Sequence, residues 1–273
     1  MTVNFGPTAN DYVKHRAGFP TEFFDRVFDE GLIEAGHSLV DFGTGTGTLA
    51  RGFAERGCNV IGLDISAQML EQAKDLCQQD ELDIDFRFAK AEATGLPDDT
   101  FDVVTAGQCW HWFDRAEAAL EAKRILKSDG LMVIAHFDWL PLEGNVVDQT
   151  EKLIQKYNPE WYERFGNKMG LYPDWLQDFG EAGFQDIQTF SFDMDVPYTP
   201  DAWRGRIRAS SGVGASLSDE DVSRFDSELK SMLAAQEQAE VTRRGLRQKD
   251  TGSHPVLQIP HRIFVAHARK LDL

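Results

Sequence analysis

The sequence predicts an α/β fold in which helices cover both faces of a parallel sheet. Between about residues 38 and 137, short apolar runs alternate with longer segments of helical periodicity. Three glycines at alternate positions, Gly43, Gly45 and Gly47, follow the first apolar run, as expected of a sharp turn or of a ligand lying against the main chain. The 273 residues, 42% of them hydrophobic, are enough for one large domain or for a core domain with an appended subdomain.

The core segment divides into five strand–helix units. The predicted strands are SLVDF (38–42), NVIGLD (59–64), IDFRFA (84–89), FDVVTAG (101–107) and GLMVIAHF (130–137). The predicted helices are TLARGFAERG (48–57), SAQMLEQAKDLCQQ (66–79), which opens on the N-cap candidate Ser66, and RAEAALEAKRILK (115–127). This alternation indicates right-handed crossovers between parallel strands.

The flanking segments are less regular. A helix is predicted after Pro20 in the lead-in, and residues 139–175 are rich in tryptophan, tyrosine and loop-forming residues. Further on, we predict a short helix at 174–183, strands at 184–196 and 261–269, and a helix at 218–240 with Ser218 and Asp221 as a capping box. The predicted divisions are a lead-in or lid at 1–37, a core at 38–138, and cap insertions with the last two strands of the same domain at 139–273.

Composition excludes several classes of protein. The formal charge of −17 disfavours a nucleic-acid partner. The sequence shows no secretory signal and no apolar run of about 20 residues, so we expect a cytoplasmic protein without a membrane partner. Cys58, Cys77 and Cys109 are too scattered for a disulfide framework, and no spacing typical of a metal site is present. The oligomeric state is left open.

Two ligands compete for the glycine-rich turn. Gly45-x-Gly47-x-x-Ala50 satisfies a dinucleotide fingerprint, but Asp41 ends the preceding strand just before Gly43. A helix N-terminus favours anions, so a pyrophosphate would not suit a carboxylate this close. A ligand that carries an ammonium and a sulfonium would suit it, which favours S-adenosylmethionine over NAD.

Asp64 supports a nucleoside ligand in either case. It ends the second strand, where a carboxylate can bind both ribose hydroxyls. The alternative is that Asp64 only serves the start of the following helix.

With these features the chain resembles the class I S-adenosylmethionine-dependent methyltransferases, in the type 11 branch of mostly small-molecule enzymes. The resembling stretches are LVDFGTGTG, VIGLDISAQMLEQA, AEATGLPDDTFDVVTAGQCWHWFD and EAKRILKSDGLMVIA, which follow one another over roughly residues 38–137. The resemblance implies a Rossmann-like sheet of seven strands in the order 3-2-1-4-5-7-6, with strand 7 antiparallel and a helical cap. The segments near 184–196 and 261–269 would be strands 6 and 7.

The resemblance also implies cofactor contacts. Asp41, Gly43, Gly45 and Gln108 would lie near the methionine part, Asp64 at the ribose, Ile65 and Met69 on the adenine, and Ala91 and Glu92 at the adenine edge, while Tyr12 and Arg16 would close over the cofactor. Many relatives have an acidic residue where this chain has Lys90, so the polar contact to adenine would rest on Glu92. Tyr12 and Arg16 are equally compatible with ordinary packing and a solvated arginine.

Methyl transfer needs an aligned nucleophile more than a dedicated set of catalytic residues. If the acceptor is a hydroxyl or a protonated amine, a base helps, and His111 is the best-placed candidate, followed by His136. His111 also suits a packed position at a helix start, and Trp110 and Trp112 suit wall and core positions. The three arginines of WRGRIRASS (Arg204, Arg206 and Arg208) suit either an anionic substrate group or a salt-bridged surface.

The predicted function is S-adenosylmethionine-dependent methylation, at O, N or C, of a small organic molecule. The alternatives are an NAD(P)-dependent oxidoreductase and a non-catalytic nucleotide-binding protein. The acceptor is expected between the segment 139–175 and His111. The aromatic residues of that segment, Trp139, Tyr157, Trp161, Tyr162, Tyr172 and Trp175, would form either a pocket wall or the core of a cap.

Overall fold

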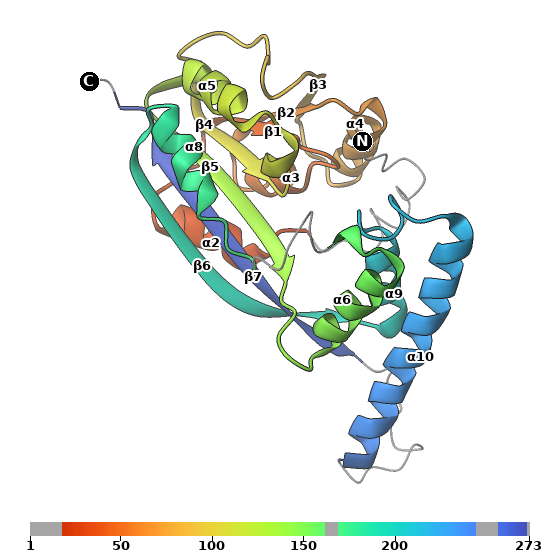
Figure 1. Cartoon of the computed structure of the whole chain (residues 1–273). Coiled ribbons are helices and arrows are strands. Elements are labelled where there is room, and N and C mark those ends of the chain that lie inside the picture. Colours follow the sequence, from red (N-terminus) through yellow and green to blue (C-terminus); the bar gives the residue numbers. More distant parts are fainter. Residues whose placement is uncertain (1–17, 162–168, 244–255, 272–273) are drawn as a thin grey trace. The chain divides into compact units, whose positions relative to one another are not determined.

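The computed structural model describes residues 18–161, 169–243 and 256–271. Its strands are β1 (Ser38–Phe42), β2 (Asn59–Asp64), β3 (Asp85–Phe88), β4 (Phe101–Gly107), β5 (Leu126–Trp139), β6 (Gln185–Tyr198) and β7 (Leu257–Arg269). They form one seven-stranded sheet in the order β3-β2-β1-β4-β5-β7-β6 (Figure 1). Strands β1 to β5 are parallel. The backbone N–H of Asp129, near the start of β5, donates a hydrogen bond to the carbonyl of Lys270, just past the end of β7. This pairing shows that β7 runs antiparallel to β5. The predicted fold class and strand order are confirmed.

The helices are α2 (Thr21–Asp29), α3 (Thr48–Ala54), α4 (Ala67–Gln79), α5 (Arg115–Ile125), α6 (Val146–Tyr157), α8 (Asp174–Glu181), α9 (Pro200–Arg208) and α10 (Asp219–Arg243), with a 3-10 turn η2 (Trp110–Trp112). The predicted N-cap is confirmed, since the Ser66 hydroxyl accepts a hydrogen bond of 3.3 Å from the Met69 N–H. None of the helices in the described ranges combines the length and the apolar content that crossing a bilayer requires.

The chain separates into two compact units. In the described part, the sheet unit consists of residues 18–137, 171–192 and 263–271, and the helical unit of 138–161, 169–170, 193–243 and 256–262. β5, β6 and β7 each have residues in both units. The predicted boundaries at residues 37 and 138 remain predictions.

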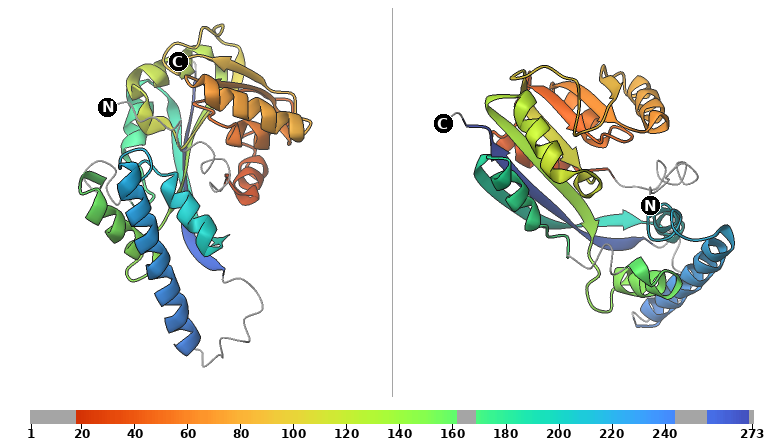
Figure 2. Two further views of the ribbon diagram at one scale, coloured as in Figure 1. Left: turned by 90° about the vertical axis from the view of Figure 1, so that its right-hand side faces the viewer. Right: turned by 45° about the horizontal axis from the view of Figure 1, so that its top comes forward.

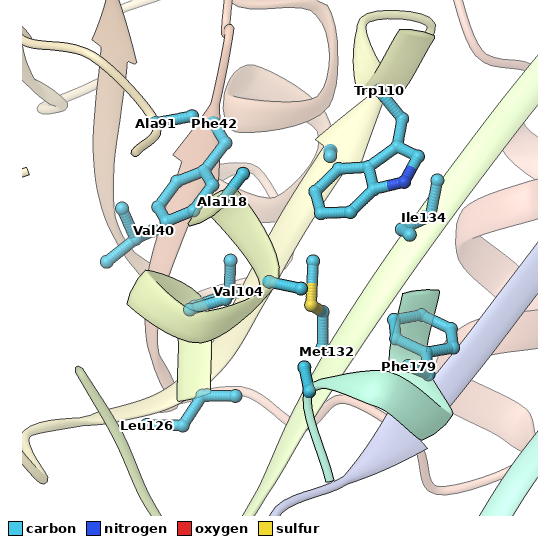
Figure 3. Close-up of a cluster of buried hydrophobic side chains, with 14 of the residues drawn as sticks. Val40, Phe42, Ala91, Val104, Trp110, Ala118, Leu126, Met132, Ile134 and Phe179 are labelled. Atoms are coloured by element: carbon cyan, nitrogen blue, oxygen red, sulfur yellow. The ribbon is translucent and has the colours of Figure 1, made fainter. Parts of the chain in front are cut away.

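The core of the sheet unit lies between the sheet and helices α5 and α8. Val40 and Phe42 of β1, Ile134 of β5, Trp110 of η2 and Phe179 of α8 are among the buried side chains that point toward one another there (Figure 3). α2 and α3 pack together on the other face of the sheet through edge-to-face phenylalanine contacts (Figures 1 and 2). Helices thus cover both faces of the sheet, as parallel sheets require.

The helical unit has its own core. α10 lies along α6 and α9 (Figure 2), and Ile154, Trp203, Phe225 and Leu229 are buried between these helices. The sequence pattern predicts α10 but neither α6 nor α9. The N-cap of α6 is Asn145, whose side chain accepts a hydrogen bond of 2.8 Å from the Asp148 N–H. The aromatic content of residues 139–175 obscured the apolar spacing of this helix.

Candidate active site

The candidate residues gather at one edge of the sheet unit. Strands β1, β2, β4 and β5 run parallel, and their pairings align Phe42 with Leu63 and with Ala106, and Gly107 with Ala135. Their carboxyl ends therefore meet at the same edge, where ligands bind in open α/β sheets. The predicted residues that the structure describes lie at the ends of β1 and β2 and in the segments that follow β1, β2, β3 and β4.

The glycine-rich turn after β1 needs its glycines for two different reasons. Gly43, Gly45 and Gly47 all have left-handed φ angles, of +59°, +56° and +78°. A Cβ on Gly43 would come within 2.9 Å of Phe113 and 3.0 Å of Cys109, so neighbouring side chains fill that position. A Cβ on Gly45 would meet only the carbonyl oxygen of Gly43, at 4.0 Å. Open space therefore lies beside Gly45, where a ligand can approach the main chain.

Asp64 at the end of β2 is bonded to the turn. Its Oδ2 accepts a hydrogen bond of 2.8 Å from the Gly45 N–H, and its Oδ1 accepts one of 2.8 Å from the Ser66 N–H. Burial raises its pKa, and these backbone donors act in the opposite direction. Asp64 thus joins the ends of β1 and β2, and it also serves the start of α4.

Asp41 is almost completely buried, with 1% of its surface exposed. Its Oδ1 accepts a hydrogen bond of 2.8 Å from the Thr105 hydroxyl on β4. Burial raises the pKa of Asp41 to about 6, and the negative charge of Asp64 acts in the same direction. A positive charge placed nearby would lower this pKa and favour the ionised carboxylate.

The predicted adenine side combines an exposed apolar residue with a bonded carboxylate. Ile65 is 62% exposed directly after Asp64, whereas Ala91 is buried. The Oε1 of Glu92 accepts a hydrogen bond of 2.9 Å from the backbone N–H of Asp114, the N-cap of α5. Glu92 therefore serves the start of α5, and its contact with adenine stays a prediction, as does that of Met69 on α4.

Gln108 has a strained backbone at the end of β4. Its φ of +58° is unusual for a residue other than glycine. The backbone N–H of Gln108 donates to the Ala135 carbonyl at 2.9 Å, and its side-chain amide donates to the Phe137 carbonyl. Such strain persists only where the surroundings impose it, and it clusters at functional sites.

His111 lies on η2 with its side chain exposed. Its ring centre is 5.3 Å from that of His136 at the end of β5, so the two candidate bases are neighbours. His136 is buried against Tyr172 and Trp175, with ring centres 4.6 Å and 5.3 Å away. The sheet unit thus surrounds the inner histidine with aromatic rings and presents the outer one to solvent.

The turn that carries His111 is anchored by a buried neighbour. Trp110 is fully buried, and its Nε1–H donates a hydrogen bond of 2.8 Å to Asp178 on α8. Trp112, by contrast, is 44% exposed. Asp178 and Thr105 could not be predicted from the sequence, because side-chain partners from distant elements leave no local pattern.

The remaining predicted residues fall elsewhere. Tyr12, Arg16 and Tyr162 lie outside the described residues. Tyr172 and Trp175 belong to the sheet unit, whereas Trp139, Tyr157 and Trp161 pack against the core of the helical unit, as expected of a cap core. Asp226 binds Arg208 at 2.7 Å and also binds Arg204, which is the salt-bridged alternative considered for these arginines. Among the described residues, no group of three His, Cys, Asp or Glu side chains is arranged to hold a metal ion.

Known proteins with similar sequences are methyltransferases. The family model described as a methyltransferase domain matches residues 40–134, which contain the glycine turn, Asp64 and His111. A methyltransferase of Schizosaccharomyces pombe is 25% identical over 190 residues, which are 69% of this chain and 71% of that protein. The 2-methyl-6-phytyl-1,4-hydroquinone methyltransferase of Synechocystis is 26% identical over 74% of this chain and 64% of that protein. These matches support a class I S-adenosylmethionine-dependent methyltransferase, with a methyltransferase domain at residues 40–134.

The solved structures agree in fold with this methyltransferase. The phosphoethanolamine N-methyltransferase 2 of Haemonchus contortus, in complex with S-adenosylmethionine, superposes with a TM-score of 0.57. The superposition covers 98% of this chain and 58% of that one, at 18% identity. The sheet unit fits the cofactor, because open space lies beside Gly45 and an exposed apolar side chain, Ile65, follows Asp64.

Proposed function

We propose that this methyltransferase transfers the methyl group of S-adenosylmethionine to a small organic molecule. The observation that carries the proposal is that one edge of the sheet unit holds both the glycine turn, bonded through Gly45 to Asp64, and the exposed His111. The formal charge of −17 supports a small acceptor over a nucleic acid. The proposal includes a cytoplasmic location and no membrane partner.

Within the proposal the residues of the edge have separate roles. Asp64 holds the ribose, Gly43 and Gly45 leave the main chain open to the methionine part, and Ile65 and Met69 pack on the adenine. When bound, the cofactor would supply a methyl group on its sulfonium. An aligned nucleophile of the acceptor would attack the methyl carbon in line while the carbon–sulfur bond breaks and S-adenosylhomocysteine leaves. One imidazole nitrogen of His111 accepts the proton that a hydroxyl or ammonium acceptor loses. His136 holds the neighbouring ring in place.

Tyr12 and Arg16 complete the proposed cofactor site. In the proposal they close over the bound cofactor from the lead-in. Gln108 and Asp41 line the methionine part, and Ala91 and Glu92 face the adenine edge. Asp41 is buried and its pKa is raised to about 6, so an ammonium or sulfonium placed nearby would favour its ionised form and attract it.

Calorimetry tests the choice of cofactor. Purified protein is titrated with S-adenosylmethionine, S-adenosylhomocysteine and NAD, and we expect binding of the first two only. Tight binding of NAD without binding of the sulfonium ligand would support the oxidoreductase instead.

Radiolabel transfer tests the acceptor. The protein is incubated with methyl-labelled S-adenosylmethionine and either a metabolite mixture or tRNA. We expect label in the small-molecule fraction. Label in tRNA would overturn the acceptor class, and cofactor binding without transfer to any acceptor would support a non-catalytic nucleotide-binding protein.

A further inference from the structure

The helical unit contains a carboxylate that two tryptophans hold in a fixed orientation. Glu151 lies on α6, Trp139 ends β5, and Trp161 follows α6. The Nε1–H of Trp139 donates a hydrogen bond of 2.7 Å to Oε1, and the Nε1–H of Trp161 donates one of 2.7 Å to Oε2. Each oxygen is therefore engaged by a neutral donor, and the plane of the carboxylate is set.

Packing alone does not call for a charge at this position. Val147, Thr150 and Ile154 are buried on α6, and Glu151 follows within the same helical stripe. A neutral acceptor such as glutamine would fill a similar volume. A partly buried carboxylate in a stripe without other charged residues costs free energy unless a positive charge compensates it.

The charged side chains that shift the pKa of Glu151 are negative. Burial raises its pKa, the two indole donors oppose that shift, and the charges of Asp138 and Asp148 raise it further. Other acidic side chains of the helical unit are paired with cations: Asp148 with Lys152 at 2.7 Å and Glu228 with Lys156 at 2.6 Å. In the part of the chain that the structure describes, Glu151 forms no such ion pair.

An organic cation is the kind of ligand that suits the remaining acceptor positions of the Glu151 carboxylate. A carboxylate offers about four acceptor positions, and the two indoles use two of them. Glu151 remains partly exposed, so a ligand can reach it. The guanidinium of Arg206 lies 4.7 Å from the ring centre of Trp139, so this aromatic cluster already accommodates a cation.

We propose that Glu151, held between Trp139 and Trp161, is a binding site for the ammonium group of a small organic molecule. The carboxylate would provide the charge and the tryptophans a rigid aromatic frame. That this ligand is the methyl acceptor rests on the proposed function, whereas the site itself does not.

The test compares choline with 3,3-dimethylbutan-1-ol, its uncharged carbon isostere, on the full chain. Selective labelling with ¹⁵N at the indole nitrogen follows the six tryptophans of the sequence by NMR, with assignments from Trp139→Phe and Trp161→Phe. We expect choline to shift the resonances of Trp139 and Trp161 at a concentration about tenfold lower than the isostere does. Equal effects of the two compounds, or no shift with choline, would overturn the proposal without any variant.

Two matched variants locate the charge. Glu151→Gln should abolish the preference for choline, whereas Glu228→Gln, which removes a paired carboxylate on α10, should retain it. A preference that survives in Glu151→Gln would place the cation elsewhere and overturn the site. Titration of the same samples with S-adenosylhomocysteine reports on the cofactor independently. If the wild-type protein bound choline but not S-adenosylhomocysteine, the proposed function would be contradicted and the cation site would stand.

Discussion

The backbone N–H of Gly45 donates a hydrogen bond of 2.8 Å to Oδ2 of Asp64, and this bond joins the turn after β1 to the end of β2. The other oxygen of Asp64 accepts from Ser66 at the start of α4. A carboxylate has acceptor positions left after two hydrogen bonds, so Asp64 can shape the turn and still bind a pair of hydroxyls. The two roles considered for Asp64, in the fold and at the ribose, are therefore compatible.

Asp64→Ala should weaken the binding of S-adenosylhomocysteine strongly. The substitution removes charge-assisted hydrogen bonds worth about 1.5–3 kcal/mol each, and it also releases the N–H of Gly45. We expect affinity to fall at least tenfold by calorimetry. Asp75→Ala, at an exposed position of α4, is the matched control and should leave affinity unchanged. Equal affinities of the Asp64 variant and the wild type would show that Asp64 is only structural.

Gly45→Ala and Gly43→Ala should have different effects. The new Cβ at position 45 meets only the Gly43 carbonyl at 4.0 Å, so the variant should fold with a modest loss from the left-handed backbone, about 1–2 kcal/mol, and should lose ligand binding. The Cβ at position 43 meets Phe113 and Cys109, so that variant should unfold at a clearly lower temperature. Circular dichroism melts and calorimetry measure the two properties. A Gly45 variant that binds normally would contradict ligand approach at this turn.

The regular part of the fold could be predicted because its signals are local. SLVDF, NVIGLD and FDVVTAG are short, mostly apolar runs, and the structure has β1, β2 and β4 at those bounds. Ser66 predicted the start of α4, because serine is a common N-cap residue. Strand order did not follow from any run of residues, and it came from the family resemblance.

The parts that could not be predicted depend on distant contacts. The positive φ of Gln108 is imposed by bonds to Ala135 and Phe137 on β5, and nothing in the local sequence requires it. The partner of Asp41, Thr105, is 64 positions away in the chain. The attachment of Trp139 and Trp161 to Glu151 likewise needs α6 to be in place.

Asp41→Asn should change how stability depends on pH. Burial raises the pKa of Asp41 to about 6, so the protonated form stabilises the fold below about pH 4, and that contribution is lost as pH rises through about 6. A pKa change of this size corresponds to about 3 kcal/mol. The asparagine side chain does not titrate and keeps an oxygen for Thr105. The free energy of unfolding of the variant, relative to that of the wild type, should therefore be higher at pH 8 than at pH 4.5. Urea unfolding at both pH values measures the difference, and a difference independent of pH would contradict the assignment.

His111→Phe should lower turnover while leaving the fold and the cofactor site intact. The side chain of His111 is exposed and its turn is anchored by Trp110, so removal of the imidazole should change the melting temperature little. Loss of a general base typically costs about 10²–10⁴-fold in rate. With an acceptor identified by radiolabel transfer, kcat should fall in this range while the calorimetric affinity for S-adenosylhomocysteine stays unchanged. His37→Phe is the control, because His37 precedes β1 and lies at the opposite edge of the parallel strands. A normal kcat in the His111 variant would leave proton removal to another group or to solvent, and an equal loss in the His37 variant would show that the effect comes from the fold.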